Sequence, residues 1–126
     1  MESAFGEART LPATEQAKTI MKQLVNKNLF ADQRHVWNLG AALGLAMGQV
    51  YEKGERGTFQ NINSLDPEGI FAAIMVGKYP SLTPEERRKK LVDHAEWGIR
   101  EIMRKEQNGT LDFSTLGIKE IAIINE

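Results

Sequence analysis

Three glycines spaced four residues apart, Gly40, Gly44 and Gly48, lie in the apolar stretch NLGAALGLAMGQ. Residues four apart fall on one face of an α-helix, so the spacing predicts a helix with an edge that carries no side chains. Each glycine inside a helix costs about 1 kcal/mol relative to alanine. A close neighbour must offset that cost: the protein's own core, a second chain, or a partner helix in a membrane.

The length of the apolar stretch argues against the membrane. From Val36 to Val50 only Asn38 and Gln49 are polar, and these 15 residues fall short of the roughly 20 that cross a bilayer. We expect a helix capped by Asp32 that reaches Glu52 and is buried on most sides. A later helix offers a matching flat surface around Ala95 and Gly98. Packing within the core is therefore our first interpretation, and a contact between chains is the second.

Three further helices complete the predicted fold. Residues 13–28 place apolar side chains at helical spacing, and residues 67–79 follow the start signal Asp66-Pro67-Glu68 and are apolar enough to be largely buried. A third helix begins after Thr83, which forms a capping box with Glu86, and ends at Asn108-Gly109. The fold class is thus all-α, a single-domain bundle of four main helices. A short two-stranded accessory of residues 58–62 with 118–124 is an allowed addition, and residues 112–116 read as a helical turn.

A chain of 126 residues fits one domain. The first dozen residues lack periodicity, so we assign 1–12 to a flexible N-terminal arm and 13–126 to a single helical domain. The sequence has no cysteine, which excludes thiolate chemistry and thiolate metal ligands and suits the cytoplasm. We expect no signal peptide, because no basic segment precedes an apolar one.

No catalytic signature is present in the sequence. The only histidines are His35 and His94, and Asp93 and His94 are adjacent, so they point about 100° apart on a helix. A metal site needs three or four converging donors, and phosphate-binding and nucleophile motifs are missing. We therefore expect no metal, no cofactor and no enzymatic activity.

Two groups of basic residues could meet an anion. Lys18 and Lys22 lie off the apolar stripe of the first helix, and the run from Arg87 through Arg88 and Lys89 to Lys90 lies in the first turns of the last one. Solvated surface is the ordinary interpretation of both groups. Positive charge near a helix N-terminus opposes the helix dipole, however, which favours contact with phosphate or an acidic partner.

Trp97 lies nearly opposite the apolar stripe of the last helix, on the same face as Arg100 and Arg104. A tryptophan on a polar face is either covered by another part of the fold or used in an intermolecular contact. Together with Gly40, Gly44 and Gly48, these three residues are the candidate interface.

Two segments carry a family resemblance: DQRHVWNLGAALGLAMG, and INSLDPEGIFAAIMVGKYPSLTPEERRKKLVDHAEWGIREI, which together cover residues 32–102. The pattern resembles small helical proteins associated with dnd-type DNA phosphorothioation and restriction gene clusters. The resemblance implies an accessory role in a prokaryotic DNA-modification or defence system and supplies no catalytic residues. We expect a non-enzymatic interaction protein that self-associates, with no membrane contact. The alternative is a small nucleic-acid-binding module that uses the basic faces of the first and last long helices.

Overall fold

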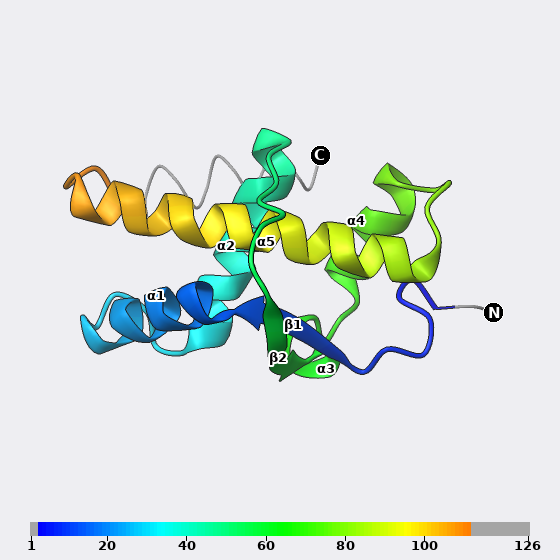
Figure 1. The fold of residues 1–126 in the computed structure, drawn as a ribbon, viewed down its shortest axis with the longest axis horizontal. Coiled ribbons are helices and arrows are strands. Elements are labelled where there is room, and N and C mark those ends of the chain that lie inside the picture. Colours follow the sequence, from blue (N-terminus) through cyan, green and yellow to red (C-terminus); the bar gives the residue numbers. More distant parts are fainter. Residues whose placement is uncertain (1–2, 112–126) are drawn as a thin grey trace.

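A computed structural model describes residues 3–111 of the chain (Figure 1). Within these residues a two-stranded antiparallel sheet accompanies five helices, so the fold is α+β and the all-α prediction was wrong. In chain order the elements are β1 (Thr10–Thr14), α1 (Glu15–Asn26), α2 (Gln33–Met47), β2 (Arg56–Asn61), α3 (Ile62–Leu65), α4 (Ile70–Lys78) and α5 (Pro84–Gln107).

The crossing of α2 and α5 organises the molecule, and Figure 1 shows α2 passing steeply behind the long α5. A methyl group added at Gly44 would overlap the backbone carbonyl of His94, and one added at Gly98 would overlap the carbonyl of Gly40. At Gly40 the added carbon would lie 2.9 Å from the backbone nitrogen of Ile99. The two backbones therefore touch where a side chain would hold them apart, and core packing of Gly40 and Gly44 is confirmed.

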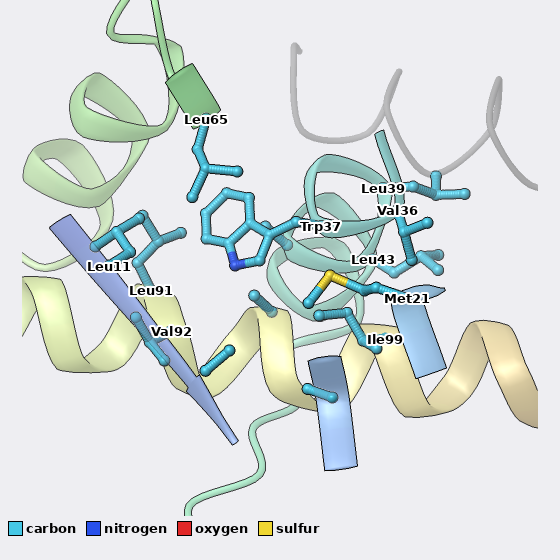
Figure 2. Packing of buried hydrophobic residues seen from close by; sticks show 14 of the residues in the cluster. Leu11, Met21, Val36, Trp37, Leu39, Leu43, Leu65, Leu91, Val92 and Ile99 are labelled. Atoms are coloured by element: carbon cyan, nitrogen blue, oxygen red, sulfur yellow. The ribbon is translucent and has the colours of Figure 1, made fainter. Parts of the chain in front are cut away.

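The core lies where α1, α2, α5 and β1 meet. Figure 2 shows the Trp37 ring among Leu65, Leu91 and Met21, and all four side chains are at least 99% buried. Trp37 also contacts the Phe71 ring edge-on, with ring centroids 5.7 Å apart. Trp37 is therefore a central residue of the core.

The sheet corrects two predictions. β1 pairs with β2, with Thr10 opposite Asn61 and Thr14 opposite Arg56, so the partner of the 58–62 segment is part of the N-terminal stretch. The predicted partner, 118–124, lies outside the described residues, as does the predicted turn at 112–116. Leu11 has no exposed surface and Phe5 is 6% exposed, so the prediction of a flexible arm was wrong for this part of residues 1–12.

Proline explains why β1 is hard to find in the sequence. Pro12 has no backbone N–H to donate and is tolerated in strands mainly at edges and bulges. The register shifts between Leu11 and Pro12, which places the proline beside a bulge. A strand of five residues with a proline at its centre has no clear alternation of polar and apolar side chains.

Most predicted helix ends are close to those observed. The Asp32 carboxylate accepts from the Arg34 amide at the start of α2, and Thr83 and Glu86 form the predicted capping box at the start of α5. α2 ends at Met47 instead of Glu52, because Gly48 adopts a left-handed conformation (φ 64°) and terminates it. No helix within residues 3–111 has the length and apolar character needed to span a bilayer.

Candidate interaction surface

α4 is the element that departs most from its predicted environment. Its nine residues, IFAAIMVGK, include seven with apolar side chains, yet Met75 is its only buried residue. The side chains of Ile70 and Val76 are 49% and 42% exposed. The prediction of a largely buried helix was wrong, and the apolar character of α4 needs another explanation.

Asp66 fixes where α4 begins. Its carboxylate accepts hydrogen bonds from the backbone amides of Phe71 at 3.1 Å and Ala72 at 2.9 Å, although the helix starts at Ile70 and not at Pro67. Gly69 makes the turn into the helix with a left-handed φ of 70°. The predicted start at Pro67 was therefore wrong: Gly69 is the N-cap residue, and the Asp66 carboxylate caps the first turn from three residues earlier.

One side of α4 forms an exposed apolar patch. We call it the α4 face, and it consists of Ile70, Ala73, Val76 and Gly77, all of which are exposed. An added carbon at Gly77 would meet no atom within 4 Å, so a neighbour could approach this helix closely. Contiguous exposed apolar surface on a small protein is typical of an interaction site.

A groove of about 400 Å³ lies between α2 and α4 and borders this face. We call it the α2–α4 groove. Its floor includes Leu39, Ala42 and Leu65, which are no more than 9% exposed. Its other lining residues are His35, Asn38, Asp66, Pro67, Glu68, Ile70, Phe71 and Ile74. The lining is thus mostly apolar, with a few polar groups that could orient an occupant.

Asn38 lines this groove, but one of its polar atoms is enclosed by the protein. Its side-chain oxygen Oδ1 is buried and has no hydrogen-bond partner among the residues that the structure describes. A buried polar atom without a partner costs on the order of 1–3 kcal/mol.

The three glycines predicted as interface residues do not lie on the candidate interaction surface. Gly40 and Gly44 are buried against α5 within the same chain, so they are not available to a second chain. Gly48 is exposed, but it terminates α2, and no atom lies within 4 Å of the place where its side chain would be. None of the three contributes to the α4 face or to the α2–α4 groove.

Trp97 and its two arginines also have neighbours within the chain. Trp97 is partly buried and packs against the core. The Arg100 guanidinium stacks on the Tyr51 ring, with Cζ 3.7 Å from the ring centroid, and bonds Glu96 Oε1 at 2.7 Å. Arg104 pairs with Glu101 and thereby lowers the pKa of that carboxyl. The position of Trp97 thus agrees with the first of its two alternatives, in which another part of the fold covers the ring.

The basic run of α5 serves the fold. Arg88 donates from Nε and Nη2 to the carbonyl of Thr10, at 2.9 Å and 2.7 Å. Arg87 donates to the carbonyls of Ala4, Tyr79 and Pro80, Lys89 pairs with Asp93, and Lys90 lies over the Tyr79 ring. These bonds attach the N-terminal segment and the α4–α5 connection to α5. Of the α1 lysines, Lys18 pairs with Glu15 and Lys22 is exposed.

Two carboxylates of α5 are buried in ion-pair networks that the sequence analysis missed. Glu96 is 1% exposed and accepts from the Thr14 amide at 2.9 Å, the Thr14 hydroxyl at 2.8 Å, and Arg100. Asp93, equally buried, accepts from Arg56 at 2.5 Å and from Lys89 at 3.0 Å. The networks join β1 and β2 to α5. Only the helical wheel, which places both carboxylates beside buried positions, could have suggested them.

His94 is buried and has a partner at each ring nitrogen. Nδ1 lies 2.7 Å from the carbonyl oxygen of Gln49 and therefore donates to it, so Nε2 accepts from the Tyr79 hydroxyl at 2.9 Å. Burial lowers the pKa of His94 and raises that of Tyr79. His94 is thus a buried histidine whose two ring nitrogens both have hydrogen-bond partners within the chain. Within residues 3–111 no three metal-binding side chains come together.

Comparisons with known proteins identify no relative of this chain. No family model, no curated protein and no solved structure matches the chain. The resemblance to dnd-associated proteins stays a prediction.

Proposed function

We propose that this protein is a non-enzymatic interaction protein that assembles with a second copy of itself through the α4 face. The observation that carries the proposal is the exposure of an almost wholly apolar helix, with Ile70 and Val76 about half exposed. Burying such side chains in a contact stabilises the assembly by about 25 cal/mol per Å² of apolar surface.

A symmetric contact suits the shape of this face. In a two-fold dimer the same patch meets itself, so it must be self-complementary. Ala73 and Gly77 provide a shallow strip on which a second helix could lie, and Ile70 and Val76 flank it. The formal net charge of −1 opposes association only weakly. The proposal places this work in the cytoplasm, in keeping with a chain that lacks cysteine.

Analytical ultracentrifugation tests the proposal. We expect the wild type to dimerise at micromolar concentration and Val76→Glu to shift the dissociation constant by at least about tenfold, since a charge would be buried in the contact. Met47→Glu is the matched control, because Met47 is 54% exposed but lies at the end of α2, outside the α4 face. A wild type that stays monomeric at high micromolar concentration would refute the proposal, as would equal effects of the two variants.

We do not extend the proposal to nucleic acid. Arg87, Arg88, Lys89 and Lys90 contact other groups of this chain, which leaves fewer of their donors for phosphate. A nucleic-acid-binding module would show DNA affinity that falls steeply with salt. Filter binding at low salt would reveal it.

A further inference from the structure

We propose that the α2–α4 groove is the docking site of the chain's own C-terminal segment, residues 112–126. This inference does not depend on self-association, because it concerns the groove beside α4 and an occupant from the same chain.

The groove offers mainly apolar surface to an occupant. Leu39, Ala42 and Leu65 form a nearly buried floor, and Phe71 and Ile74 on the α4 side are partly buried. A segment that carries apolar side chains would bury this surface together with its own.

The end of α5 turns the chain back toward the molecule. Gly109 adopts a left-handed φ of 70°, and the Thr110 amide donates to the Lys105 carbonyl at 2.8 Å. Such a turn closes a helix and reverses the chain. Leu111 then packs against the hydrophobic core. The chain therefore arrives at residue 112 already in contact with the protein body.

The distance to the groove is within reach of the segment. α5 meets Gly40 of α2 at Gly98, nine residues before the helix ends at Gln107, which corresponds to roughly 14 Å along the axis. Passing around α2 adds about 10 Å, the diameter of a helix. The 15 residues from 112 to 126 span about 22 Å as a helix and about 50 Å when extended.

The composition of the segment matches the groove. Six of its 15 residues are large apolar ones: Phe113, Leu116, Ile118, Ile121, Ile123 and Ile124. Left in water, these side chains would each forfeit about 1.5–3 kcal/mol of burial. Four of its residues are charged, namely Asp112, Lys119, Glu120 and Glu126, so docking must leave these four side chains at the solvent while the apolar ones enter the groove.

Cysteine cross-linking in the full-length chain tests this inference, because the protein has no cysteine of its own. Ile74→Cys places a thiol in the groove, and Met47→Cys is the matched control at the exposed end of α2. Each is combined with one of three polar tail positions, Ser114→Cys, Lys119→Cys or Asn125→Cys. Disulfide formation is followed by mass spectrometry under mild oxidation.

We expect at least one tail position to form an intramolecular disulfide with the groove cysteine about tenfold faster than with the control cysteine, because docking raises the effective concentration of the pair. In that pair, adding Ile121→Asp and Ile124→Asp should abolish the difference. Equal rates at the two sites would overturn the inference. Disulfides formed only between chains would also overturn it, since the occupant would then be the tail of a second copy. If the protein is monomeric and forms intramolecular disulfides, only the proposed self-association is refuted.

Discussion

Gly44 and Gly77 are both helical glycines, but their surroundings differ completely. A methyl group at Gly44 would overlap the His94 carbonyl, and one at Gly77 would meet nothing within 4 Å. We expect Gly44→Ala to destabilise the protein by about 2–4 kcal/mol, because two helix backbones must separate. Gly77→Ala should instead stabilise it by up to about 1 kcal/mol through helix propensity. Urea unfolding of the two variants measures both effects. If both substitutions changed the free energy of unfolding in the same direction, the close contact between Gly44 and His94 would be contradicted.

Glu96 is a second residue whose contribution to stability depends on its surroundings. It accepts three hydrogen bonds from Thr14 and Arg100 while being 1% exposed. Removing one member of a buried ion pair costs about 3–5 kcal/mol, so we expect Glu96→Ala to lower the free energy of unfolding by that amount and Glu96→Gln to lower it less.

Glu15→Ala is the control for this experiment. Glu15 pairs with Lys18 but its side chain is 88% exposed, and exposed pairs contribute no more than about 1 kcal/mol. Urea unfolding compares the three variants. A loss on Glu96→Ala as small as that on Glu15→Ala would contradict a structural role for the network.

At the scale of elements, the start of α4 depends on a single carboxylate. Asp66 accepts from the amides of Phe71 and Ala72, and loss of such a cap typically costs about 1–2 kcal/mol. We expect Asp66→Ala to accelerate hydrogen exchange of these two amides, while exchange at the start of α5, which Thr83 caps, stays unchanged. Asp66→Asn should preserve part of the protection. Unchanged exchange in Asp66→Ala would show that the cap does not hold the helix.

The elements that could be predicted from the sequence are those with strong local signals. The capping box of Thr83 and Glu86 and the N-cap Asp32 gave helix starts that agree with the structure. β1 could not be predicted, because Pro12 interrupts its pattern and its pairing with β2 depends on residues more than 40 positions away. The exposure of α4 could not be predicted either, since an apolar helix looks the same whether the core or a partner covers it. For that reason the α4 face and the α2–α4 groove were absent from the predicted interface.

At the scale of the whole molecule, His94 connects three parts of the chain. It lies on α5, donates to the Gln49 carbonyl in the segment after α2, and accepts from Tyr79 at the end of α4. Burial is the main cause that lowers its pKa, and the nearby charges of Lys90 and Lys78 act in the same direction. The folded state therefore favours the neutral ring, while the unfolded chain takes up a proton near the ordinary value of about 6.5.

This difference in pKa predicts a loss of stability in mild acid. The stabilisation is fully present above the unfolded value and is lost as pH falls from about 6.5 through the lower folded pKa. Carboxyls with lowered pKa values, such as Asp32, Glu86 and Glu101, lose their contributions only at more acidic pH. We expect the free energy of unfolding of the wild type, from urea titrations, to decrease between about pH 7.5 and about pH 5. In His94→Gln this slope should be much smaller, whatever the variant's absolute stability. Tyr79→Phe should keep most of the slope, because burial and not the phenol is the main cause of the shift. A wild-type slope retained in His94→Gln would assign the acid sensitivity to another group.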